Sequence, residues 1–175
     1  MNTKNYIDDI LLELEAKIGI EYEKGSNDIG KIPTLEPNYY RPISPMLKVR
    51  FNILSHLLDA THGDWLSIKE MELLWDDDIQ DTRIRDIKNN LIANIENWEN
   101  NAGALFKKNR LSLFAGSAYT YEQIYLLWLD GFEEPQLWIY DTNGEARFID
   151  LDDYLKSFID DDVTVYEKSR WFSIQ

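Results

Sequence analysis

The spacing of apolar residues along the chain changes near residue 105. Before that point, apolar residues recur every three or four positions, which is the period of an amphipathic helix. This spacing predicts helices at residues 6–18, 44–58 and 83–100, and favours a short helix over a strand at 66–74. Ser44-Pro45 marks a helix start, because serine caps free N–H groups and proline suits the first helical position. Residues 21–38 are rich in Gly, Pro, Ser and Asn and predict a loop.

After residue 105 the apolar residues form short runs with the alternation of strands. Strands are predicted at residues 111–115, 124–129, 136–140 and 145–149. Asn143-Gly144 joins the last two, and both residues tolerate the positive φ angles of a tight hairpin turn. Helices followed by meandering strands predict an α+β fold, in which a mostly antiparallel sheet from the C-terminal half is flanked by helices from the N-terminal half.

A final amphipathic helix is predicted directly after the hairpin. Its apolar stripe consists of Leu151, Tyr154, Leu155, Phe158 and Ile159. Asp150 is the expected N-cap, and Asp153 follows three residues later in the first turn. Residues 163–166 and 171–174 fit either short strands or a packed tail.

Composition narrows the class of protein. The 175 residues suit one domain spanning 1–175, and 44% are hydrophobic, which is enough for a core. Cysteine is absent, which excludes disulfides, zinc–thiolate sites and cysteine nucleophiles. Neither a signal peptide nor an apolar run of about 20 residues is visible. We therefore expect a soluble, cytoplasmic protein that does not act at membranes.

The net charge of −14 is unevenly distributed. Residues 119–175 hold 13 acids and 4 bases, a net charge of −9, and residues 1–118 hold 19 acids and 14 bases, a net charge of −5. The electrostatic field of this negative charge repels the phosphate backbone of a nucleic acid, so direct binding of nucleic acid is not expected. The same field attracts a basic protein. The alternative is that the acidity serves solubility alone.

The polar residues form no recognisable catalytic or metal-binding motif. His56 and His62 are six residues apart, so one helix would not direct both to one metal ion. Asp76, Asp77, Asp78 and Asp81 lack the spacing of a calcium loop. We therefore predict no enzymatic activity, no metal and no cofactor. A metal-dependent hydrolase that uses clustered aspartates is the alternative, since carboxylates from different elements can converge.

The amino-acid sequence of the last third resembles that of a known family. A strand ending in Trp128-Leu129-Asp130-Gly131 is followed by Glu133-Glu134-Pro135-Gln136-Leu137-Trp138-Ile139-Tyr140-Asp141, then by Phe148 and Tyr154-Leu155. This stretch is similar to the SUKH superfamily, which includes fungal cell-wall synthesis regulators and many bacterial immunity proteins. The Pro45-led helix and the His62-Gly63 turn are similar to the family's proline-led helix and Asn-Gly turn. The resemblance spans residues 44–159.

The resemblance implies an α+β fold with a bent antiparallel sheet and no catalytic residues. It also implies an immunity protein that binds and neutralises a toxin, and the acidity of this chain suits a basic nuclease toxin. A regulatory or scaffold protein of the cell-wall-regulator type is the alternative, and the oligomeric state stays open. The expected partner-binding residues are an acidic set with two aromatic anchors: Tyr119, Tyr121, Glu133, Glu134, Asp152, Asp153, Asp160, Asp161 and Asp162.

Overall fold

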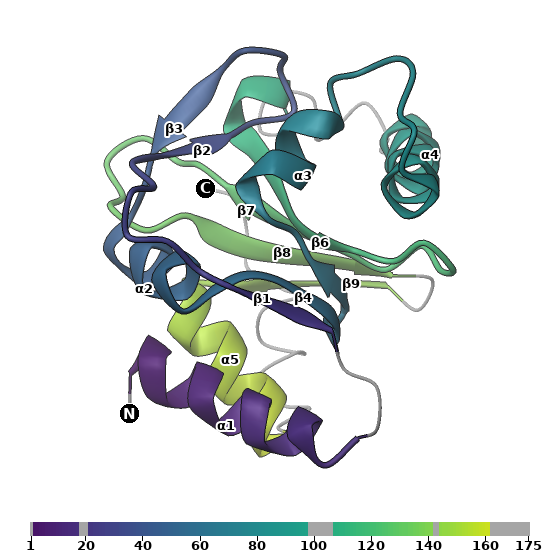
Figure 1. Cartoon of the computed structure of the whole chain (residues 1–175). Helices are drawn as coiled ribbons and strands as arrows, with labels where there is room; N and C mark the ends of the chain where they lie inside the picture. The colour runs from purple at the N-terminus through teal and green to yellow at the C-terminus, as the bar shows by residue number, and fades with distance from the viewer. Residues whose placement is uncertain (1, 18–20, 98–106, 142–143, 162–175) are drawn as a thin grey trace.

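Helices and antiparallel strands build an α+β fold, as the sequence predicts (Figure 1). The computed structural model describes residues 2–17, 21–97, 107–141 and 144–161. The helices are α1 (Thr3–Glu15), α2 (Pro45–Ile53), α3 (Ile68–Leu73), α4 (Thr82–Asn97), α5 (Leu151–Asp160) and the 3₁₀ turn η2 (Lys108–Arg110). The strands are β1 (Tyr22–Lys24), β2 (Lys31–Pro33), β3 (Tyr40–Pro42), β4 (Leu54–Thr61), β5 (Gly63–Trp65), β6 (Leu111–Gly116), β7 (Gln123–Leu127), β8 (Gln136–Asp141) and β9 (Gly144–Phe148).

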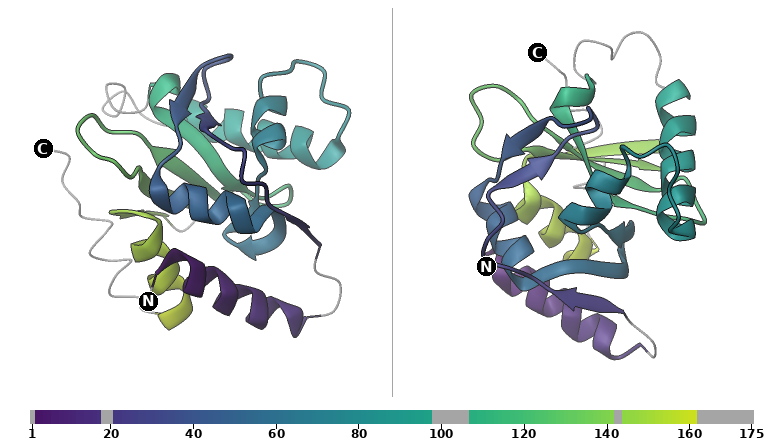
Figure 2. Two further views of the ribbon diagram at one scale, coloured as in Figure 1. Left: turned by 60° about the vertical axis from the view of Figure 1, so that its left-hand side comes forward. Right: turned by 45° about the horizontal axis from the view of Figure 1, so that its top comes forward.

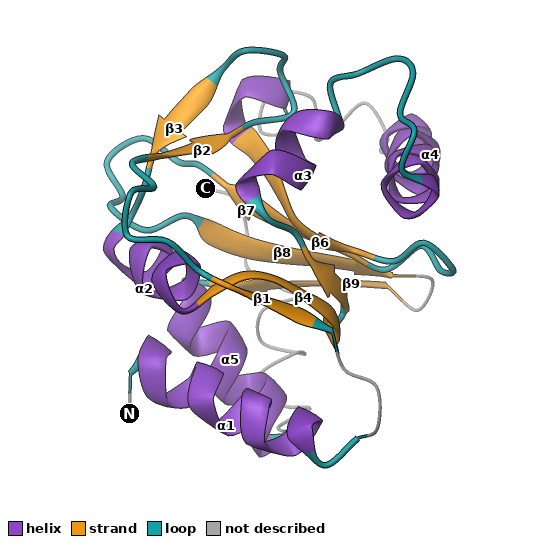
Figure 3. Cartoon of the chain, viewed as in Figure 1, coloured by secondary structure: helices purple, strands orange, loops and turns teal. Residues whose placement is uncertain are grey.

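The main sheet has seven strands in the order β1-β4-β5-β6-β7-β8-β9, and every neighbouring pair is antiparallel (Figure 3). Three strands come from the N-terminal half, so the sheet reaches further back along the chain than predicted. Register shifts interrupt the β1–β4, β4–β5 and β6–β7 pairs. Such irregularities bend strands and increase the local twist. The hairpin β2–β3 forms a separate two-stranded sheet.

The helices lie on both faces of the sheet (Figures 1 and 2). Helices α1, α2 and α5 pack together on one face, where Tyr154 of α5 meets Phe148 of β9 with ring centroids 5.4 Å apart. Helix α4 lies over the opposite face, where Asn94 donates a hydrogen bond to Gln123 of β7. We call these the α5 face and the α4 face. Side chains of each strand alternate between them, because successive residues of a strand point to opposite sides.

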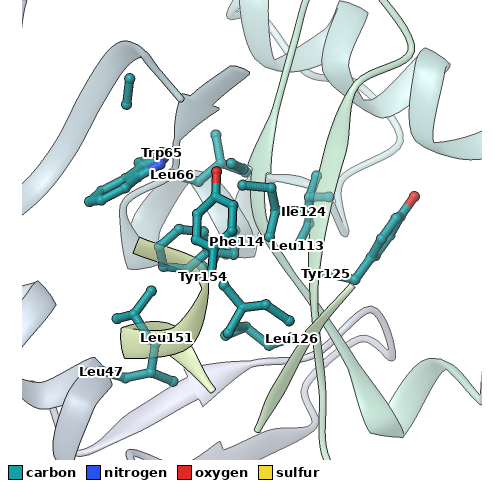
Figure 4. Packing of buried hydrophobic residues seen from close by; sticks show 14 of the residues in the cluster. Leu47, Trp65, Leu66, Leu113, Phe114, Ile124, Tyr125, Leu126, Leu151 and Tyr154 are labelled. Carbon is teal, nitrogen blue, oxygen red and sulfur yellow. The ribbon is translucent and has the colours of Figure 1, made fainter. Parts of the chain in front are cut away.

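The core on the α5 face combines aromatic rings, among them Trp65, Phe114 and Tyr154, with leucine side chains (Figure 4). The rings of Trp65 and Phe114 lie 5.2 Å apart. The Tyr154 hydroxyl lies 2.6 Å from the Thr61 hydroxyl, which also accepts a 2.9 Å hydrogen bond from the Trp65 indole. These contacts join α5 to β4 and β5. They satisfy polar atoms that burial would otherwise leave unpaired.

Arg50 is completely buried on the same face and links α2 to the strand that follows it. Its guanidinium donates hydrogen bonds to the carbonyl oxygens of Leu54, Ser55 and Leu66 at 2.9 to 3.2 Å. It lies 3.9 Å from the centre of the Phe51 ring. Burial lowers the pKa of Arg50 to about 9, against the opposing charge of Glu70. The guanidinium therefore carries its charge at neutral pH.

The predicted helix at 44–58 is wrong from Leu54 onward. Helix α2 ends at Ile53, and Leu54 begins β4 with φ −131° and ψ 131°. Leu47, Phe51 and Leu54 keep a helical spacing, so local periodicity gives no sign of the change. Backbone pairing of β4 with β1 and β5 and the three carbonyl contacts of Arg50 favour the extended form.

The loop predicted at 21–38 contains the short strands β1 and β2. Each has only three residues and depends on partners further along the chain, β4 for β1 and β3 for β2. The helices at α1, α3 and α4 and the strand β6 are confirmed. The β8–β9 hairpin and α5 are also confirmed, and Asp150 accepts a 2.9 Å hydrogen bond from the N–H of Asp153.

The first helix ends at Glu15, earlier than the predicted end at Ile18. Other predicted features lie outside the described residues: Gly19, Trp98 and residues 100–103, which were predicted to end the third long helix, Asn143, and residues 162–174. Among the helices of the described residues, none has the length and apolar character needed to cross a membrane.

Candidate binding surface

The loop between β6 and β7, residues 117–122, carries the two tyrosines predicted as anchors. We call this loop the tip. Ser117 turns the chain there: its hydroxyl accepts hydrogen bonds from the N–H groups of Tyr119 and Thr120, each at 3.1 Å. The N–H of Ser117 donates to the carbonyl of Glu122 at 3.1 Å, which closes the loop at its base. Serine favours such turns because its short side chain reaches nearby backbone groups.

Helix α4 holds the tip from the side. The Asn90 amide donates to the carbonyls of Ser117 and Thr120, both at 3.0 Å. The Asn94 amide donates to the carbonyl of Tyr121 at 3.1 Å. Asn90 and Asn94 are four residues apart and therefore lie on the same side of the helix. These bonds fix the backbone of the tip in one arrangement.

Tyr119 and Tyr121 project from this fixed backbone. Tyr119 is 97% exposed and Tyr121 is 47% exposed. Tyrosine is enriched among the residues that supply most of the binding energy of protein interfaces. The tip therefore has the property expected of a protein-binding loop, namely exposed rings on an ordered backbone.

The surroundings of the tip are acidic. In an antiparallel meander, alternate loops lie at the same end of the sheet, so the tip and the start of β9 are neighbours. The pairing of Gln123 with Tyr140 and of Tyr140 with Glu145 connects them. Glu145 is exposed, whereas Glu122 is half-buried. Residues 117–123 contain one acid and no lysine or arginine, while on β9 Glu145 lies close enough to Arg147 for their charges to interact.

Glu133 and Glu134 lie at the other end of the sheet, on the loop between β7 and β8. Glu133 is exposed, whereas Glu134 is half-buried. Glu134 accepts a 2.8 Å hydrogen bond from the N–H of Met46 in the first turn of α2. The Ser44 hydroxyl, predicted to cap this helix, makes no capping hydrogen bond. Glu134 therefore serves a helix start and is not freely available to a partner.

Asp152 and Asp153 also have partners within the molecule. The carboxylate of Asp152 accepts a hydrogen bond from the Thr3 hydroxyl at the start of α1. That of Asp153 accepts one from the N–H of Ile149 at 3.2 Å. Both lie in the first turn of α5, where the helix dipole favours negative charge. Together with Glu134, these acids stabilise the starts of three helices that pack side by side.

Asp160 and Asp161 are exposed at the other end of α5. Asp161 ends the helix in a left-handed conformation with φ 48°. Asp162 lies outside the described residues. The predicted acidic set is thus divided between the tip, the β7–β8 loop and the two ends of α5. The structure does not bring it together as one face.

Five residues at or near the tip were not predicted as parts of a site: Asn90, Asn94, Ser117, Glu122 and Glu145. Asn90 and Asn94 carry a usable signal, since two amides four residues apart on a helix can act on one neighbouring loop. Their partners are about 30 residues further along, and only the fold reveals them.

A second group of polar side chains lies between β4, β5, α3 and α4. Arg83 donates to Asp64 at 3.0 Å and contacts Glu70, while the ring of His56 lies 3.4 Å from Glu70. Burial acts to lower the pKa of Arg83, but Glu70 and Asp64 outweigh it and the pKa is raised. Glu70 also completes a capping box with Ser67 at the start of α3.

This group holds α3 and α4 against the sheet. Its carboxylates are engaged by Arg83 and by backbone N–H groups, which leaves them poorly placed to bind a cation. Asp81, from the acidic run considered for metal binding, accepts a 3.1 Å hydrogen bond from Ile84 at the start of α4. Within the described residues, no three histidine, aspartate or glutamate side chains are arranged to hold a metal ion.

Comparison of the chain with protein-family models, curated proteins and solved structures found no match.

Proposed function

We propose that this protein is a non-enzymatic immunity protein that binds and neutralises a basic toxin, with the tip at the centre of the interface. The observation that carries the proposal is Tyr119, which is 97% exposed on a backbone held by Ser117 and Asn90. An aromatic ring on an ordered loop loses little conformational entropy when it enters a partner's pocket. Such residues supply much of the binding energy of an interface.

The charge around the tip supports a basic partner. Glu122 follows Tyr121 in the tip, Glu145 lies at the same end of the sheet, and the whole chain carries a net charge of −14. Long-range attraction of this kind speeds the encounter between two proteins more than it strengthens the final complex. A nuclease toxin is a suitable partner, because a protein that grips phosphates needs a positive surface. The resemblance to the SUKH superfamily supports the same assignment.

The proposal is tested with the polypeptide encoded by the neighbouring large gene, since an immunity gene lies beside its toxin gene. We expect the full chain to retain this polypeptide in a pull-down. Tyr119→Ala should weaken the complex by about tenfold or more. The matched control is Tyr22→Ala, which removes a tyrosine that is 46% exposed on β1. Equal affinity of the two variants for this polypeptide would show that the tip is not part of the interface.

The contribution of charge is measured by the association rate over a series of salt concentrations. Glu122→Lys should slow association at low salt and flatten the salt dependence. Asp160→Lys makes the same change in net charge at the far end of α5 and is the comparison. A larger effect of Asp160→Lys on the association rate would show that the partner is attracted mainly to the C-terminal end of α5. If neither variant changes the rate, the partner is not attracted by these charges.

A further inference from the structure

A basic patch lies at the end of the sheet opposite the tip. It consists of Lys107, Lys108 and Arg110 around η2, together with Arg41 of β3. The Nε of Arg41 donates a 3.0 Å hydrogen bond to the carbonyl of Asn109, which joins two segments 68 residues apart. We call these four residues the basic patch. It is unexpected in a chain whose net charge is −14.

The cations of the patch are available to a ligand. Lys107 and Lys108 are exposed and Arg41 is half-buried. Within the described part of the chain, no carboxylate forms an ion pair with any of these three side chains. Arg110 pairs with Asp130 at 2.9 Å, but the Asp130 side chain is 77% exposed. Exposed ion pairs of this kind contribute little to stability, so a competing carboxylate can replace Asp130.

Arg41 is oriented before any ligand arrives. Its Nε is fixed by Asn109, and its guanidinium lies 5.5 Å from the centre of the Tyr39 ring. The remaining guanidinium nitrogens can form charge-assisted hydrogen bonds with a carboxylate. Tyr39 is 40% exposed and offers an apolar surface beside them. The patch thus combines a fixed arginine, two flexible lysines and an exposed aromatic ring.

We propose that the basic patch binds a short acidic segment of a protein. The charges of patch and ligand are complementary, and Tyr39 suits a polypeptide that carries apolar side chains between its acids. A nucleic acid fits less well, because duplex DNA presents a phosphate about every 1.7 Å along its axis. Such a polyanion would extend beyond four cations onto the acidic remainder of the molecule. This site is independent of the function proposed for the tip.

The test uses a fluorescently labelled polyglutamate peptide of about ten residues and measures anisotropy with the full chain at low salt. We expect saturable binding that the double variant Lys107→Glu/Lys108→Glu weakens by about tenfold or more. The control is Lys4→Glu/Lys17→Glu, which changes two exposed lysines of the N-terminal region. It alters the net charge equally, but it should leave peptide binding close to that of the wild type.

Chemical-shift changes on peptide addition should centre on Lys108, Arg110 and Arg41. Three results would overturn the proposal: no binding of the peptide to the wild type, equal weakening in both double variants, or shifts centred elsewhere. An oligothymidine of about ten nucleotides serves as the competing probe. Tighter binding of this DNA than of the peptide would assign the patch to nucleic acid and reject an acidic protein segment. Tyr119→Ala should leave peptide binding unchanged, whatever its effect on the proposed toxin complex.

Discussion

The carboxylate of Glu134 accepts a 2.8 Å hydrogen bond from the backbone N–H of Met46, 88 residues earlier in the chain. The first N–H groups of a helix have no partner within the helix, so an acceptor from another element can replace a side-chain cap. Glu134 takes this role for α2, whose own Ser44 makes no capping bond. The contact fixes the β7–β8 loop to the start of a helix that contributes to the core.

Glu134→Ala should therefore lower the free energy of unfolding by about 1 kcal/mol, the usual effect of losing a helix cap. Urea denaturation measured by circular dichroism would show the change. Glu133→Ala is the matched control, because Glu133 is exposed. Equal stability of the two variants would mean that the Met46 contact contributes nothing measurable.

The same contact predicts a dependence on pH. Burial raises the pKa of Glu134, while Ser44 and the N–H of Met46 act against the shift. Because the pKa is higher in the folded state, the stability associated with protonation is present below the unfolded pKa and is lost as pH rises through the folded value. Glu134→Gln keeps an acceptor oxygen and cannot ionise. Its stability relative to the wild type should therefore increase between about pH 4 and about pH 7.

Denaturation of the wild type and Glu134→Gln at both pH values measures this difference. Glu133→Gln should show no comparable trend. A constant difference between the wild type and Glu134→Gln would contradict the predicted direction of the pKa shift.

Gly63 is required in the turn between β4 and β5. It has φ +93°, and a Cβ atom there would lie 2.5 Å from the carbonyl carbon of Gly116 and 2.8 Å from the nitrogen of Ser117. Gly63→Ala should lower the free energy of unfolding by about 2 kcal/mol or more, since both the φ angle and the contact become unfavourable. Gly30→Ala is the control, because nothing lies within 4 Å of its Cβ position. Thermal denaturation should show a clearly lower midpoint for Gly63→Ala than for Gly30→Ala.

The buried Arg50 predicts that arginine and lysine are not equivalent at this position. A guanidinium reaches the three carbonyl oxygens of Leu54, Ser55 and Leu66 at once, whereas an ammonium is smaller and more strongly hydrated. Arg50→Lys should lower the free energy of unfolding by about 2 kcal/mol, because buried acceptors lose their donors. The reciprocal change Lys48→Arg, at an exposed position of α2, should have little effect. Similar stability of the two variants would show that charge alone is needed at position 50.

The features predicted from sequence are those whose signals are local. The β8–β9 hairpin and α5 follow from neighbouring residues, including Asp150 at the helix start. The end of α2 was missed because Leu54 continues the helical spacing of Leu47 and Phe51, while the forces that extend the chain come from distant strands. Tertiary pairing overrides local propensity in such segments.

The candidate site was predictable only in part for the same reason. Tyr119 was predicted as a partner-binding anchor, and its ring is exposed. The contact of Asn90 with that loop, and that of Glu134 with Met46, join residues 30 and 88 positions apart. The positions of the acidic residues in the sequence do not show which of them stabilise the start of a helix and which face solvent. The predicted acidic face therefore included Glu134 and Asp152, which have partners inside the molecule.

The packing of α1 against α5 has a consequence for synthesis of the protein. Thr3 of α1 contacts Asp152 of α5, 149 residues later, and both helices lie on the same face of the sheet. The ribosome releases α1 before it makes α5, so the part of α1 that packs against α5 has no partner until α5 has been synthesised. Closure of this face must follow completion of α5. The nascent chain therefore reaches its final fold only after α5 has been released from the ribosome.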